Sequence, residues 1–125
     1  MDKKKVMVVD DEKDFLQLTK AALEDTGEYE VLTLSEAKEI IQKLHEFKPA
    51  VILLDVRMPN LNGLEACRLL NKDAVGKNTP VIFVSILEDD ANKLDAFRAG
   101  AVDYLPKSAS KDQLIHKIEK ALENK

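Results

Sequence analysis

The chain has 125 residues, of which 45% are hydrophobic and 34% charged, with a formal net charge of -4 and a pI of about 5.2. This length fits one compact domain over residues 1–125, and the acidic balance argues against direct nucleic-acid binding, which needs a basic surface. A single cysteine, Cys67, excludes an internal disulfide. Together with the lack of a signal peptide or a membrane-length apolar segment, it favours a cytoplasmic location without a membrane partner.

The first half of the chain alternates short apolar runs with helical patterns. Residues 6–9, 29–34 and 51–54 are nearly continuous apolar runs, which are typical of strands covered on both faces of a parallel sheet. Two helical faces are predicted between them from residues at helical spacing, namely Phe15, Leu18, Ala22 and Leu23, then Ala37, Ile40, Ile41 and Leu44.

The second half repeats this alternation. Residues 80–84 and 102–105 predict two more strands. Three further helical faces are predicted, comprising Leu64, Cys67, Leu70 and the stem of Arg68, then Leu94, Phe97 and Ala101, then Leu114, Ile115, Ile118 and Leu122. Cys67 is expected to be a small core residue.

Cap residues agree with these boundaries. Ser35, Asn62 and Ser110 are predicted to precede the second, third and fifth helices, and Gly27 and Gly100 to follow the first and fourth. Five strands alternating with five helices predict an α/β fold, a doubly wound parallel sheet with strand order 2-1-3-4-5. Such sheets bind ligands beyond the carboxyl ends of their strands.

Polar residues follow four of the five predicted strands. Asp10, Asp11 and Glu12 follow the first, Asp55 the third, Ser85 ends the fourth, and Lys107 follows the fifth. Each alone has an ordinary interpretation, such as a helix cap, a turn residue or a solvated lysine. Those interpretations do not explain why acids, a hydroxyl and a base share one edge.

Metal binding and phosphoryl transfer explain better why these acids, the hydroxyl and the base lie together. Neighbouring carboxylates repel one another and favour a hard cation such as Mg²⁺, which takes oxygen ligands and shares phosphate oxygens. An aspartate can also act as a nucleophile toward a phosphoryl group, with Lys107 and Ser85 supplying positive charge and a hydroxyl donor. Asp55, after the central strand, is the predicted acceptor.

These motifs resemble the receiver domain of bacterial-type two-component response regulators. They are VVDDE (residues 8–12), LLDVRMPNLNG (53–63), PVIFVS (80–85) and AGAVDYLPK (99–107). The resemblance covers nearly the whole chain and implies a flavodoxin-like three-layer sandwich. It also implies a phosphoprotein that acts as a signalling switch, a phosphoacceptor that catalyses its own phosphorylation and dephosphorylation rather than a conventional enzyme.

The resemblance implies a role for each matched residue. Asp55 is the phosphoacceptor, and Mg²⁺ is held by Asp55, by Asp11 directly, by Asp10 partly through water and by the backbone carbonyl of Arg57. Lys107 contacts the phosphoryl group, Ser85 is the switch hydroxyl, and Tyr104 is the aromatic residue whose rotamer follows it. The implied partners are a histidine kinase or phosphotransfer protein and an output protein or domain of unknown identity, and homodimerisation stays open.

Two residues depart from the family pattern. Ser108 replaces the usual proline after the lysine, where the family has a cis bond, which leaves the geometry of the following loop open. Ile86 replaces a usually small residue after Ser85 and could narrow access to the site.

Two alternatives remain. One is a Mg²⁺-dependent aspartyl-phosphate phosphohydrolase similar to haloacid dehalogenase-type enzymes, although Arg57 stands where those enzymes have a second acid and cannot transfer protons at neutral pH. The other is a phosphorylation-independent interaction module, supported only by Ser108 and Ile86. Residues 112–124 are predicted to complete the last helix, and we expect the chain to be either a stand-alone receiver or a part of a larger regulator. His45 and His116 are expected to be partly exposed helix residues.

Overall fold

The computed structural model describes residues 2–56, 63–86 and 90–123. Its strands are β1 Lys4–Val9, β2 Tyr29–Leu34, β3 Val51–Leu54, β4 Val81–Ser85 and β5 Asp103–Pro106. Its helices are α1 Lys13–Glu24, α2 Ile40–Phe47, α3 Gly63–Lys72, α4 Asp90–Arg98 and α5 Lys111–Glu123, with short 3₁₀ turns η1 Ala37–Glu39 and η2 Gly76–Asn78.

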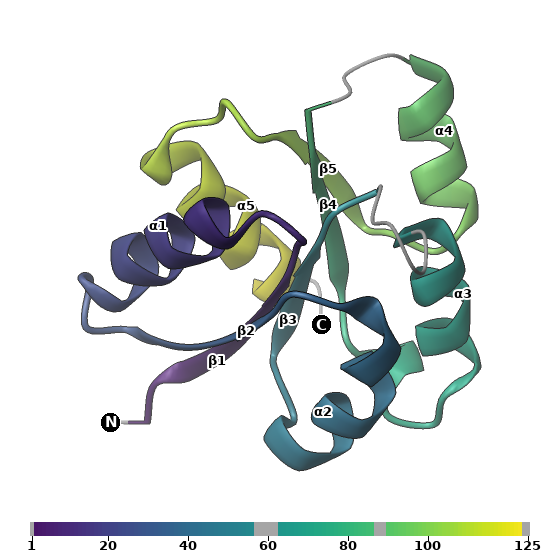
Figure 1. The fold of residues 1–125 in the computed structure, drawn as a ribbon, viewed down its shortest axis with the longest axis horizontal. Helices are drawn as coiled ribbons and strands as arrows, with labels where there is room; N and C mark the ends of the chain where they lie inside the picture. Colours follow the sequence, from purple (N-terminus) through teal and green to yellow (C-terminus); the bar gives the residue numbers. More distant parts are fainter. Residues whose placement is uncertain (1, 57–62, 87–89, 124–125) are drawn as a thin grey trace.

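The five strands form one parallel sheet in the order β2-β1-β3-β4-β5, which confirms the predicted fold class and strand order. The register pairs Val9 with Leu34 on one side and with Leu54 on the other. On the far side of β3, Leu54 pairs with Phe83. The carboxyl ends of the strands therefore meet at one edge of the sheet, the upper edge in Figure 1.

Helices cover both faces of the sheet. Helices α1 and α5 lie on one side, and α2, α3 and α4 lie on the other (Figure 1). Alternate strand residues enter the two resulting cores: Met7 and Ile52 pack with α2, α3 and α4, whereas Val8 and Leu53 pack with α1 and α5. Both sets are buried, which is why the strands are continuous apolar runs rather than alternating patterns.

The predicted face of the first helix is partly wrong. Leu18 is 71% exposed, whereas Leu16, Thr19 and Leu23 are buried. These three residues form a stripe at i, i+3 and i+7, the spacing of a single helix face, and Leu18 lies beside that stripe. The buried stripe of α1 is thus narrower and more polar than its apolar residues indicated.

The predicted face of the fourth helix is also partly wrong, since of its three residues only Ala101 is buried. Leu94 and Phe97 are 50% and 48% exposed, while Ala96 and Ala99 are buried. Small side chains allow α4 to approach the sheet closely. The larger apolar residues consequently lie on the outer side of the helix.

Helix ends agree with the predictions in three of five positions. Ser110 caps α5, since its Oγ accepts a hydrogen bond from the Gln113 N–H at 3.1 Å and the Gln113 side chain accepts one from the Ser110 N–H at 2.9 Å. Gly27 and Gly100 have left-handed φ angles of 77° and 109°. Ser35 does not cap the second helix, because η1 intervenes and begins after Glu36. Asn62 lies outside the described residues.

Among the described residues, no helix combines the length and the apolar character that a membrane crossing requires.

Candidate functional site

The predicted site residues lie at the carboxyl edge of the sheet, each directly at or after the end of a strand. Backbone hydrogen bonds extend the ladder beyond the strands: the Asp10 N–H donates to Leu34, the Asp55 N–H to Val9, and the Lys107 N–H to Ser85, at 3.0, 3.0 and 2.9 Å. The main chain at each position is therefore fixed by its neighbouring strand. The side chains of these residues are therefore attached to main chain that is held by the sheet rather than to unpaired loops.

Three carboxylates converge at this edge. One oxygen from each of Asp10, Asp11 and Asp55 lies within 4.8 Å of the others. Asp10 and Asp55 are only 1% and 6% exposed, while Asp11 is exposed. Burial raises the pKa of the Asp10 carboxyl, and its hydrogen bond with Lys107 offsets only part of that effect.

This donor set fits Mg²⁺. The ion takes carboxylate oxygens, keeps several waters, and binds through one or two protein carboxylates together with phosphate oxygens. The exposed position of Asp11 beside two buried acids gives a ligand set that is open to water on one side. Arg57, whose carbonyl was predicted as a further ligand, lies outside the described residues.

The Lys107 ammonium lies against the acids and is largely buried, with 10% of its side chain exposed. Its Nζ is 2.8 Å from Asp10 Oδ2, 2.5 Å from Glu12 Oε1 and 3.5 Å from Asp55 Oδ2. Burial alone would lower the pKa of Lys107, but the hydrogen bonds with Asp10 and Glu12 outweigh burial and raise it. The ammonium consequently stays charged at any physiological pH.

Two contacts of Lys107 were not predicted from the sequence. Its ammonium lies 4.9 Å from the centre of the Phe15 ring, a cation–π distance, and Glu12 makes its shortest ion pair. The sequence predicts Phe15 only as a residue of the first helix face, and Glu12 only as one of the acids that follow the first strand. Their spacing of three residues at the start of a helix is a signal that would have placed both on one side.

Ser85 and Tyr104 lie on the two neighbouring strands next to Lys107. Ser85 ends β4 and is 1% exposed, and its carbonyl holds the Lys107 N–H. Tyr104 is 7% exposed and lies opposite Phe83 in the β4–β5 register. The phenol is buried within the core that faces α2, α3 and α4.

Gly63, the first residue of α3, lies directly against the backbone of Asp55. A Cβ built on Gly63 would collide with the Asp55 carbonyl and the Val56 Cα, and the Gly63 N–H donates to the Val56 carbonyl at 2.7 Å. Only glycine allows this approach. The start of α3 thereby fixes the main chain that carries the Asp55 side chain.

The two positions that depart from the family pattern can be located. Ile86 is 75% exposed. The peptide bond between Lys107 and Ser108 is trans, because the described part of the chain contains no cis bond. The loop from β5 to α5 therefore follows a trans path, and Ala109 N–H closes it onto the Pro106 carbonyl at 3.0 Å.

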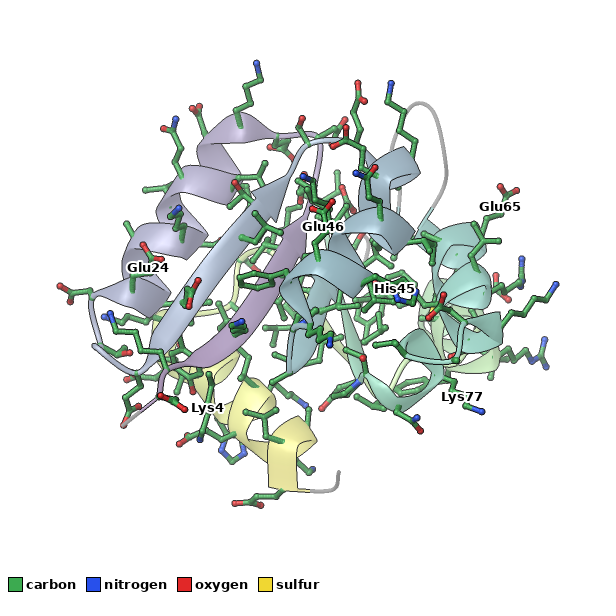
Figure 2. All side chains as sticks on the ribbon, turned by 90° about the horizontal axis from the view of Figure 1, so that it is seen from below. Lys4, Glu24, His45, Glu46, Glu65 and Lys77 are labelled. Atoms are coloured by element: carbon green, nitrogen blue, oxygen red, sulfur yellow. The ribbon has the colours of Figure 1, made fainter. Side chains whose placement is uncertain are left out.

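Residues away from this edge behave as ordinary structural groups. Cys67 is fully buried, as predicted, and burial raises the pKa of its thiol to about 11, which removes it as a nucleophile. The partly exposed side chain of His45 extends from α2 toward α3, where its Nε2 lies 2.8 Å from Asp73 Oδ2 (Figure 2). His116 is exposed on α5.

Comparison with known proteins gives the same assignment over almost the full chain. The sequence model of the response regulator receiver domain matches residues 6–119. Protein RcaC of Microchaete diplosiphon is 35% identical over 95% of this chain, and protein PilH of Pseudomonas aeruginosa is 34% identical over 94%. The crystal structure of chemotaxis protein CheY4 of Vibrio cholerae superposes with a TM-score of 0.91 at 27% identity, covering 97% of this chain and 100% of that one.

The relatives differ in length. The chain spans 18% of RcaC and about half the length of several other curated relatives that it matches. It spans 97% of PilH.

Proposed function

Because this chain belongs to the response regulator receiver family of two-component systems, we propose that it accepts a phosphoryl group on Asp55 and acts as a phosphorylation-dependent switch. The observation that carries the proposal is the buried convergence of Asp10, Asp55 and Lys107 at one sheet edge, with the exposed Asp11 beside them. Phosphoryl transfer needs little more than a positioned nucleophile and compensation of negative charge.

The residues divide into two groups by role. Asp10, Asp11 and Asp55 would hold Mg²⁺, with the carbonyl of Arg57 as a further ligand, and the ion would supply positive charge against the phosphoryl oxygens. Lys107 supplies positive charge from a second direction. Its ammonium is already within 3.5 Å of Asp55, so no long movement is needed for it to reach a phosphoryl group there.

In the transfer step, an Asp55 carboxylate oxygen attacks the phosphorus atom of the donor. The new bond is an acyl phosphate, and the bond from phosphorus to the donor atom breaks with its electron pair staying on the leaving group. For a phosphohistidine on a histidine kinase or phosphotransfer protein the leaving atom is an imidazole nitrogen, and for acetyl phosphate it is a carboxylate oxygen. Water reverses the modification by hydrolysis of the acyl phosphate.

The switch follows from new contacts. Ser85 ends the strand next to Asp55, and its hydroxyl can donate a charge-assisted hydrogen bond to a phosphoryl oxygen on Asp55. Tyr104 is buried in this structure. In the proposed switch, the contact between Ser85 and the phosphoryl group shifts the balance between this orientation of the ring and an exposed one. An output partner then distinguishes the two populations at the α4–β5–α5 side of the molecule.

The test is incubation with Mg²⁺ and acetyl phosphate, followed by intact mass. The expected result is a gain of one phosphoryl group that requires Mg²⁺ and is absent in Asp55→Asn. No gain, or the same gain in Asp55→Asn, would contradict the proposal. Sustained release of phosphate from a phosphomonoester would instead indicate a phosphohydrolase.

A further inference from the structure

Glu12 makes the shortest ion pair of the site, although the proposed function assigns it no role. Its Oε1 accepts a hydrogen bond from Lys107 Nζ at 2.5 Å, compared with 2.8 Å for Asp10 and 3.5 Å for Asp55. All three contacts are ion pairs, and Asp55 is the most distant of the three carboxylates. In this structure the ammonium is therefore shared among them, and Glu12 holds it most closely.

The start of α1 holds the Glu12 carboxylate in this place. Glu12 occupies the N-cap position, its side chain makes no capping hydrogen bond to the helix, and its N–H donates to Asp10 Oδ1 at 2.9 Å. Phe15 lies three residues further on, and its ring is the other surface that Lys107 contacts on α1. The Glu12 carboxylate at the N-cap of α1 and the Phe15 ring within α1 thus both contact the ammonium beside the acceptor.

A phosphoryl group on Asp55 would form its ion pair with the same Lys107 ammonium. Lys107 can donate three hydrogen bonds, and a negatively charged phosphoryl group competes for them with the carboxylates already present. Phosphoryl oxygens on Asp55 draw the ammonium toward Asp55, which is now its most distant partner, and so weaken its contact with Glu12. Glu12 also adds negative charge close to the position where an anionic donor arrives.

We propose that Glu12 is a positioning residue that holds Lys107 at α1 and thereby weakens the binding of a phosphoryl group at Asp55. This inference rests on the proposed function. The effect on phosphoryl binding should be small, because 58% of the Glu12 side chain is exposed to solvent and exposed ion pairs contribute little free energy. The expected effect of removing the charge is about a two- to five-fold change in affinity.

The experiment uses beryllofluoride, a stable stand-in for the phosphoryl group, titrated into the full chain at saturating Mg²⁺ and followed by calorimetry. Glu12→Gln removes the charge and keeps the side-chain length. Glu28→Gln is the matched control, because Glu28 is an exposed acid next to β2 at the opposite edge of the sheet. Mg²⁺ affinity is measured separately for all three proteins without beryllofluoride.

The two affinities should move in opposite directions. Glu12→Gln should bind beryllofluoride about two- to five-fold more tightly, because Lys107 is released, and bind Mg²⁺ more weakly, because negative charge is lost beside the cation. Glu28→Gln should match the wild type in both. In addition, the Lys107 Nζ resonance in NMR spectra of the Mg²⁺-free protein should shift in Glu12→Gln and stay in place in Glu28→Gln.

Four results would overturn the inference: unchanged beryllofluoride affinity in Glu12→Gln, weaker binding of both ligands as expected for a purely structural role, an equal change in Glu28→Gln, or an unshifted Lys107 resonance. Failure of the proposed function is recognised separately. In that case the wild type itself binds no beryllofluoride and gains no phosphoryl group, while the NMR comparison still reports whether Glu12 holds Lys107.

Discussion

At Asp10, Asp55 and Lys107, charged side chains are held almost entirely out of water. Burial of an unpaired carboxylate is costly, and the raised pKa of Asp10 reflects that cost. Lys107 offsets part of it, but one ammonium faces the carboxylates of Asp10, Asp55 and Glu12. The excess of negative charge is what a divalent cation bound at this edge would neutralise, in agreement with the proposed Mg²⁺ site.

Asp73 provides a test of electrostatics far from this site. Its contact with His45, and then the hydrogen bonds from the Gly76 and Val75 N–H groups, lower its pKa from 3.8 to about 2. An acid whose pKa is lower in the folded state stabilises the fold above its unfolded pKa and loses that contribution as the pH falls. We expect the wild type to have a higher free energy of unfolding than Asp73→Asn at about pH 5, and this difference to become smaller as the pH falls to about 2.

Urea unfolding at a series of pH values measures this gap. The control is the same comparison in a His45→Gln background, which removes the largest cause of the lowered Asp73 pKa. There the effect of Asp73→Asn on the free energy of unfolding should change less between pH 5 and pH 2. A gap between the wild type and Asp73→Asn that is constant from pH 5 to pH 2 would contradict the assignment.

The acids and Lys107 could be predicted from the sequence for a simple reason. Each lies at the end of an apolar run, and the ends of parallel strands share an edge, so topology alone brings residues 10, 55 and 107 together. Glu12 and Phe15 could not be predicted in the same way. Their contact with Lys107 depends on how α1 is rotated about its axis and on where the preceding turn points, which no strand pairing fixes.

At the scale of elements, the buried strands were the easiest to predict and α4 the hardest. Runs such as β3 are continuous because both faces of the sheet are covered. In α4, Ala96 and Ala99 are buried and Leu94 and Phe97 are half-exposed, so hydrophobicity alone points to the wrong face. Alanine carries too little apolar area to mark an inner face, yet it permits the closest packing.

The junction between β3 and α3 gives a prediction at this scale. In Gly63→Ala the new Cβ would collide with the Asp55 carbonyl, which is rigid backbone, so the turn must shift. We expect a loss of unfolding free energy of about 2 kcal/mol, typical of overpacking, together with weaker Mg²⁺ binding because the Asp55 main chain moves.

Urea unfolding and Mg²⁺ titration measure the two effects. Gly27→Ala is the matched control: its Cβ would meet nothing within 4 Å, and its cost is only that of a left-handed backbone. It should lose about 1 kcal/mol and keep its Mg²⁺ affinity. Equal Mg²⁺ binding in wild type and Gly63→Ala would show that Gly63 does not position Asp55.

For the molecule as a whole, binding of a cation at the sheet edge should stabilise the entire fold, because an unfolded chain cannot assemble the site. At a Mg²⁺ concentration about ten times its Kd, linkage adds about 1.4 kcal/mol to the free energy of unfolding. For a domain of this size this raises Tm by about 5 °C.

Thermal unfolding with and without Mg²⁺ checks this prediction, with NaCl at equal ionic strength as the control for screening. Asp11→Asn removes the exposed carboxylate of the cluster and should lose most of the shift. An equal rise in Tm in Asp11→Asn, or with NaCl alone, would place the effect of Mg²⁺ elsewhere on the molecule.

The strand order has one more consequence. Asp10, Asp55 and Lys107 are far apart along the chain, and they meet only because β1, β3, β4 and β5 are all paired. In an unfolded, truncated or misfolded chain, Asp55 is an ordinary aspartate with ordinary reactivity. If Asp55 is the acceptor as proposed, the fraction of molecules that a small donor phosphorylates would report the fraction that is natively folded, and the reaction would serve as a folding assay for any variant of this protein.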